Sequence, residues 1–67
     1  METVKDFEDA FLQEAMDEGR QVRLFHTTGY QQVVTILDYS MDALLVQRDN
    51  EKKCLVYRHG LSTIVME

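Results

Sequence analysis

The stretch that decides the fold is residues 57–65, Tyr57-Arg58-His59-Gly60-Leu61-Ser62-Thr63-Ile64-Val65. It places a basic pair, Arg58 and His59, between two short runs rich in residues that favour strands. Gly60 follows the pair, and glycine is common where the chain reverses direction. The pattern predicts a turn between two strands, where a guanidinium and an imidazole can meet a ligand.

Strand-like segments continue upstream of this turn. Strands are predicted over residues 21–27, 30–39, 43–47, 53–58 and 61–65, so that a five-stranded sheet covers 21–65. Thr28-Gly29 marks the first turn, because glycine tolerates the positive φ that such turns need, and residues 48–52 form a polar turn. Short antiparallel strands of this kind usually curl into a small barrel or strongly bent sheet, which limits exposed edges.

A helix is predicted over residues 6–18, ahead of the strands. Asp6 can cap its first amides, and Gly19 suits the left-handed position at its end. Apolar residues at helical spacing form one stripe: Phe7, Phe11, Leu12, Ala15 and Met16. The sequence therefore predicts a mainly β protein with an N-terminal α-helix, in a single domain over residues 1–67.

The chain is small and acidic. Its 67 residues can bury only about 60% of the unfolded surface, so we expect self-association to support the fold. The net charge is −5, and residues 1–18 alone carry seven acids against Lys5, or −6. Residues 19–67 carry six bases and five acids, or +1, which leaves room for a local anion site.

No catalytic, metal or cofactor site is expected. Cys54 is the one cysteine, lies in an apolar run and is expected to be buried, while His26 and His59 lack zinc-ligand spacing. No nucleophile–base pattern or phosphate-binding loop is present, so we expect no enzyme activity. No segment has the pattern of a signal peptide or membrane span, and we expect a cytoplasmic protein without membrane contact.

The order of these motifs resembles Hfq, the bacterial Sm-like RNA-binding protein. The most specific match is Tyr57-Arg58-His59-Gly60-Leu61-Ser62-Thr63, which stands where Hfq has Tyr-Lys-His-Ala-Ile-Ser-Thr. Weaker matches are Asp9-Ala10-Phe11-Leu12 at the helix, Gly29 at the first turn and Tyr39-Ser40-Met41-Asp42 at the Phe-Asp-x-Phe position. The resemblance implies the Sm-like fold, a small open barrel of five strands.

The resemblance also implies a homohexameric ring that acts as an RNA chaperone and post-transcriptional regulator. The fourth strand of each subunit would pair with the fifth strand of its neighbour, with Tyr57, Leu61, Thr63 and Val65 at the subunit interface. The implied partners are other copies of the chain and single-stranded RNA, both small RNA and mRNA.

Two RNA-binding faces are implied by the same resemblance. At the proximal pore, which binds uridine-rich RNA in the family, the matching residues are Tyr39, Met41, Arg58 and His59. Binding there is expected to be weakened, because Asp42 replaces a stacking Phe and Glu8 replaces a Gln that contacts the base. At the distal face, which binds adenine-rich RNA, the matching residues are Phe25, His26, Gly29 and Tyr30. The family also has a basic patch on the helix, at the rim of the ring. Here only Arg20 remains near those positions, so we expect no binding of RNA helices at the rim.

Two other interpretations stay open. The chain could be a ring that has lost most RNA binding and serves as a protein-interaction scaffold, presenting its acidic helix to a basic protein partner. It could also be a monomer or a smaller assembly, if the strand edges no longer match.

Overall fold

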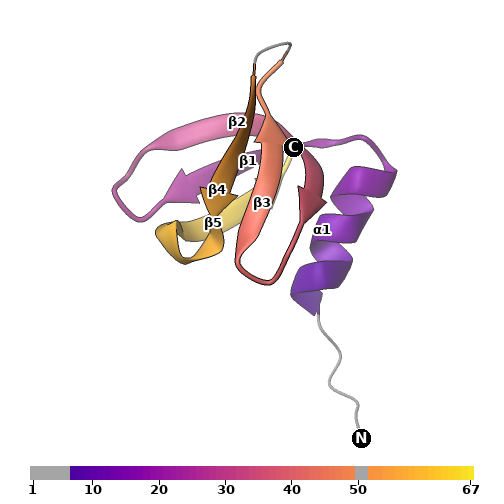
Figure 1. Cartoon of the computed structure of the whole chain (residues 1–67), viewed down its shortest axis with the longest axis horizontal. Coiled ribbons are helices and arrows are strands. Elements are labelled where there is room, and N and C mark those ends of the chain that lie inside the picture. Colours follow the sequence, from indigo (N-terminus) through magenta and orange to yellow (C-terminus); the bar gives the residue numbers. More distant parts are fainter. Residues whose placement is uncertain (1–6, 50–51) are drawn as a thin grey trace, which may run out of the picture.

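The computed structural model describes residues 7–49 and 52–67, and in these the helix and strands follow in the predicted order (Figure 1). Helix α1 spans Phe7–Asp17, and η1, a single 3₁₀ turn, spans Arg58–Gly60. The strands are β1 (Gln21–His26), β2 (Gln31–Tyr39), β3 (Ala43–Gln47), β4 (Lys53–Tyr57) and β5 (Leu61–Met66). The predicted class, mainly β with an N-terminal helix, is confirmed; the predicted cap, Asp6, lies outside the described residues.

The five strands form one antiparallel sheet in the order β4-β3-β2-β1-β5. The register shifts between Phe25 and His26 and again between Ile36 and Asp38, and such irregularities increase local bending and twist. The sheet is accordingly strongly bent, with β1 and β5 behind β3 and β4 in the view, and α1 to one side (Figure 1). β4 and β5 each pair with one strand only and are the two edges.

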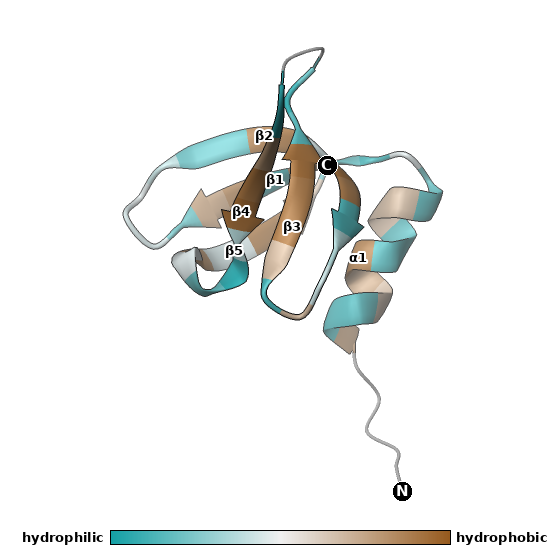
Figure 2. Cartoon of the chain, in the orientation of Figure 1, coloured by the Kyte–Doolittle hydropathy of each residue, from teal (hydrophilic) through white to brown (hydrophobic). Residues whose placement is uncertain are grey.

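The core lies inside the bend and is built by strand alternation. Val22 and Leu24 of β1 are fully buried, whereas the residues between and beside them are not. The other strands and α1 complete it with Leu12, Ala15, Val34, Ile36, Leu44, Val46 and Val56. Figure 2 shows apolar residues along β3 and β4, although on β4 only Val56 belongs to the core.

The predicted stripe of α1 is correct except at its first residue. Leu12 and Ala15 are buried, and Phe11 and Met16 pack against the core while keeping some exposure. Phe7, the first residue of α1, remains 74% exposed.

Gly19 and Gly29 have the positive φ predicted for them, +62° and +97°. At Gly19 the amide of Arg20 donates to the carbonyl of Ala15 at 3.0 Å, and the amide of Gly19 donates to Met16 at 3.1 Å. These two bonds are the Schellman pattern that ends a helix.

The prediction that Cys54 is buried is wrong. Its side chain is exposed, since β4 is an edge strand on which only Val56 reaches the core.

Candidate nucleic-acid interface

Arg58 is held at η1 by contacts that come from two other parts of the chain. Its backbone amide donates to the carbonyl of Asp42 at 2.8 Å. Its guanidinium donates to the carbonyl of Ser40 at 2.7 Å through Nη1 and to Glu8 Oε1 at 2.6 Å through Nη2. The Arg58 side chain is 18% exposed, and Asp9 lies 3.9 Å from Nη1. The cation that matches the family's pore lysine is therefore already paired with a carboxylate.

A cavity of about 330 Å³ lies beside this ion pair. It is lined by Glu8, Asp9, Tyr39, Ser40, Met41 and Arg58, so three of the four predicted pore residues come together. His59 does not line it: the imidazole is exposed, with its ring centroid 6.1 Å from that of Tyr57. Tyr39 also fastens α1 to β2, because its hydroxyl lies 3.1 Å from Gln13 Oε1 and 3.3 Å from the carbonyl of Asp9.

A larger, more apolar cavity of about 540 Å³ lies between α1 and β5. Phe7, Phe11 and Leu12 line it from the helix, and Leu61 and Ile64 line it from the strand. Glu8 and Arg58 border both cavities, so their ion pair separates the two hollows.

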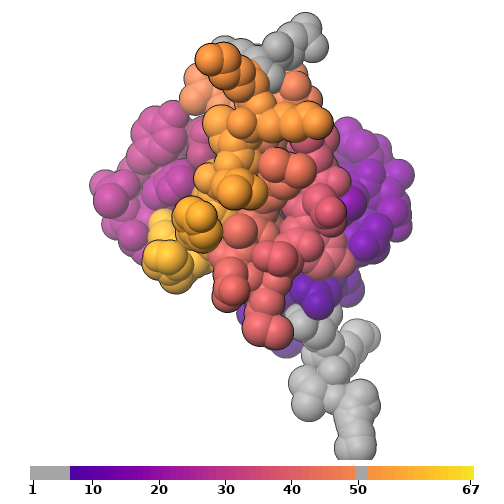
Figure 3. Space-filling view, in the orientation of Figure 1, coloured from indigo at the N-terminus to yellow at the C-terminus, as the bar shows by residue number. Residues whose placement is uncertain are grey.

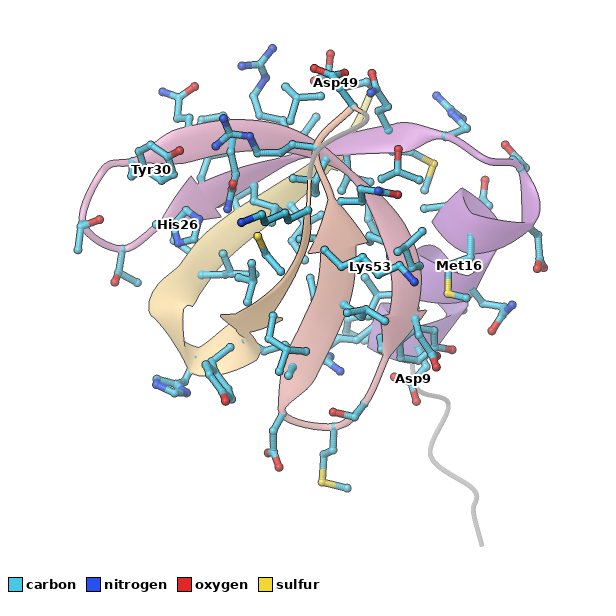
Figure 4. All side chains as sticks on the ribbon, turned by 45° about the horizontal axis from the view of Figure 1, so that its top comes forward. Asp9, Met16, His26, Tyr30, Asp49 and Lys53 are labelled. Atoms are coloured by element: carbon cyan, nitrogen blue, oxygen red, sulfur yellow. The ribbon has the colours of Figure 1, made fainter. Side chains whose placement is uncertain are left out.

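The predicted distal residues gather at the turn between β1 and β2. The amide of His26 donates to the carbonyl of Tyr30 at 2.8 Å, and the amide of Gly29 donates to His26 at 2.9 Å, closing the turn. The rings of His26 and Tyr30 are 5.3 Å apart between centroids and tilted by 47° (Figure 4). Tyr30 is 52% exposed, whereas Phe25 on β1 is half-buried. Tyr30 thus offers a ring face on which a base can stack.

Arg48 also belongs to this group, although no motif in the sequence pointed to it. Its Nη1 donates to the Tyr30 hydroxyl at 3.2 Å from the end of β3, eighteen residues away. Gln32 also takes part, since its Nε2 lies 3.0 Å from His26 Nε2. Arg48 and Tyr30 are far apart in the sequence, and nothing in the sequence shows that the β1–β2 turn meets the end of β3.

Both edges of the sheet carry exposed apolar side chains. On β4, Leu55 is 60% exposed and Tyr57 is 55% exposed, and on β5, Val65 is 42% exposed. In the space-filling view β4 lies on the surface, with no other element covering it (Figure 3). Of the predicted interface residues, Tyr57, Thr63 and Val65 are exposed and Leu61 is half-buried. Exposed apolar residues on unpaired strands mark a surface suited to pairing with another chain.

The cations near the end of α1 pair within the chain. Arg20 donates to the carbonyl of Glu67 at 2.7 Å and lies 3.5 Å from Glu18 Oε1. Arg23 contacts the Glu67 carboxylate at 3.2 Å. This end of the molecule therefore lacks a cluster of uncompensated cations among its described residues.

Within residues 7–49 and 52–67, no group of three His, Cys, Asp or Glu side chains could hold a metal ion. No helix in that part of the chain is long and apolar enough to cross a membrane.

Comparison with known proteins agrees with the resemblance seen in the sequence. The chain is 32% identical over 60 residues to the RNA-binding protein Hfq of Caldicellulosiruptor bescii, and 30% identical over 60 residues to that of Caldicellulosiruptor saccharolyticus. Each alignment covers 90% of this chain but 65% and 61% of the relative, so the chain spans just under two thirds of their length. No protein-family model matches the chain.

The match in structure is closer than the match in sequence. A crystal structure of the pleiotropic translational regulator Hfq matches with a TM-score of 0.87 over the whole of both chains, at 24% identity. The predicted Sm-like fold is thereby confirmed, and the resemblance to Hfq holds in sequence as well as in structure.

Proposed function

We propose that this chain, a homologue of the Hfq proteins with their Sm-like fold, binds single-stranded RNA as a homohexameric ring and acts as a post-transcriptional regulator. The observation that carries the proposal is the similarity to two proteins named RNA-binding protein Hfq, joined to the same fold. The partners would be small RNA and mRNA in the cytoplasm.

Adenine-rich RNA would bind the face that carries Tyr30. An exposed aromatic ring contributes about 1–3 kcal/mol per stacked base, for any base that reaches it. Tyr30 is exposed and braced by His26 and Arg48, which supports it as the main stacking residue. Phe25 would add a second, less accessible ring, and Gly29 would keep the turn narrow.

We expect Tyr30→Ala to weaken oligo-A binding by about tenfold, and Phe25→Ala by less, because Phe25 exposes less of its ring. Fluorescence anisotropy of labelled oligo-A at low salt measures this, and light scattering on the same samples reports the assembly. Thr28→Ala, an exposed change in the same turn, is the control. An intact ring that does not bind oligo-A at micromolar concentration would contradict the proposal.

Uridine-rich RNA would bind the pore weakly. Arg58 pairs with Glu8 and lies near Asp9, so an approaching phosphate must compete with carboxylates for the guanidinium. Asp42, an exposed residue near Arg58, offers no ring for stacking. Six copies of a chain of charge −5 carry −30, which makes any RNA binding depend strongly on salt.

Pore binding should increase when Glu8 and Asp42, two of its carboxylates, are replaced. Glu8→Gln keeps the side-chain shape and ends an exposed ion pair, so oligo-U affinity should rise only about two- to fivefold, as such pairs are weak. Asp42→Phe adds a stacking ring and should raise it by about tenfold or more. The same anisotropy titration, with Glu14→Gln as a charge-matched control on α1, tests both changes. Unchanged oligo-U affinity in the double variant would refute the weakened-pore proposal.

The second candidate is a protein-interaction scaffold. The observation that favours it is the ion pair between Glu8 and Arg58, the residue that matches the pore cation of the family. In that case an intact ring would bind neither oligonucleotide, and a basic protein would bind its acidic helix instead.

A further inference from the structure

A hydrogen bond joins the turn between β1 and β2 to the end of β3. Arg48 Nη1 donates to the Tyr30 hydroxyl at 3.2 Å. The bond fixes the outer end of the Tyr30 side chain, while 52% of the residue stays exposed. Tyr30 is thus held from one side without being covered.

The Tyr30 ring also lies close to His26. The two ring centroids are 5.3 Å apart, and His26 Nε2 lies 3.0 Å from Gln32 Nε2 on β2. Tyr30 therefore contacts both an imidazole and a guanidinium, from His26 on β1 and from Arg48 just after the end of β3. We call His26, Tyr30, Gln32 and Arg48 the Tyr30 cluster; Figure 4 labels its two ring members.

The local charge around Arg48 differs from that of the chain. Residues 48–53 carry three bases, Arg48, Lys52 and Lys53, against the acids Asp49 and Glu51, which gives +1 in a chain of −5. In the sequence, Arg48 therefore lies in a short, slightly positive segment of an acidic protein. Guanidinium is the side-chain group that best matches phosphate geometry.

We propose that Arg48 binds the phosphate of a nucleotide whose base stacks on Tyr30, and that its bond to the Tyr30 hydroxyl holds the ring in place for stacking. The inference rests on the proposed RNA binding and adds a phosphate-binding residue to the stacking face. A single-stranded nucleic acid fits this combination, because it presents a base and a flexible phosphate within reach of each other.

The salt dependence of binding separates a phosphate contact from a merely structural role. For single-stranded nucleic acid, each phosphate contact adds about 0.7 to the slope of log affinity against log salt concentration. Arg48→Ala should therefore lower oligo-A affinity about tenfold at low salt and reduce the slope by about 0.7 for each subunit contacted. Arg48→Lys should restore most of the slope, since it keeps the charge. Tyr30→Phe should keep the slope, because it removes only the hydroxyl bond.

Arg20→Ala is the matched control, since it removes an exposed arginine at the other end of β1. All variants are measured as the full chain by anisotropy with labelled oligo-A, and far-UV circular dichroism verifies their folding. If Arg48→Ala leaves the salt dependence of affinity unchanged, or if Arg20→Ala reduces it equally, this inference is overturned while RNA binding stands. Absence of oligo-A binding by the unmodified ring overturns both proposals.

Discussion

Leu44→Ala is expected to lower the free energy of unfolding by about 2–5 kcal/mol, the usual cost of truncating a buried leucine. Leu44 is 0% exposed, and β3 places it between β2 and β4 within the bend. The alanine variant leaves a cavity that the surrounding strands fill only in part. A chain of 67 residues has a total stability of about 3–10 kcal/mol at typical values per residue, so one substitution removes a large share of it.

Urea denaturation followed by far-UV circular dichroism measures this change. All variants are compared at one protein concentration, because association also contributes to apparent stability. Met41→Ala is the control: Met41 is 87% exposed, so its truncation opens no cavity and should change stability by less than about 0.5 kcal/mol. Equal urea midpoints for the two variants would mean that Leu44 is not part of the core that stabilises the fold.

The core was predictable because strand and helix periods are local properties of the sequence. Val22 and Leu24 alternate with more polar neighbours, and both are fully buried as that alternation requires. Gly19 and Gly29 were predictable for a similar reason, since a turn that needs positive φ selects glycine at that residue.

The edges of the sheet were not predictable in the same way. Residues 53–57 resemble a buried strand in composition, yet four of the five are exposed, among them Cys54. Whether a strand is central or at an edge depends on the strand order, which is a property of the whole sheet. Phe7 fits the helical period, yet it is 74% exposed at the start of α1.

The site was predictable only as a set of residues. The family motif placed Glu8 and Arg58 in the same predicted site, but the bond that joins them spans 50 residues. The bond from Arg48 to Tyr30 likewise depends on two turns that meet in space. Contacts of this kind follow from the bend of the sheet, and no local pattern in the sequence indicates them.

Leu55→Asp is expected to convert the proposed ring into monomers. Leu55 is 60% exposed on the edge strand β4, so the change should leave the subunit folded. In the proposed ring, however, this strand pairs with β5 of a neighbour, and a buried leucine there contributes about 1.5–3 kcal/mol per interface. Aspartate removes that contribution and adds the cost of burying a charge. Light scattering should then report about 7.9 kDa in place of 6 × 7.9 = 47.4 kDa.

Thr28→Asp is the control for Leu55→Asp, since it adds the same charge at an exposed turn residue outside both edge strands. It should keep the mass of the unmodified protein, and circular dichroism should show all three proteins folded. The monomer should also bind oligo-A about 10²-fold more weakly or worse, because linked sites in a ring bind one RNA by avidity. If Leu55→Asp keeps the full mass, the chains associate through another surface. If the unmodified chain is already a monomer, the exposed edges of β4 and β5 do not drive assembly.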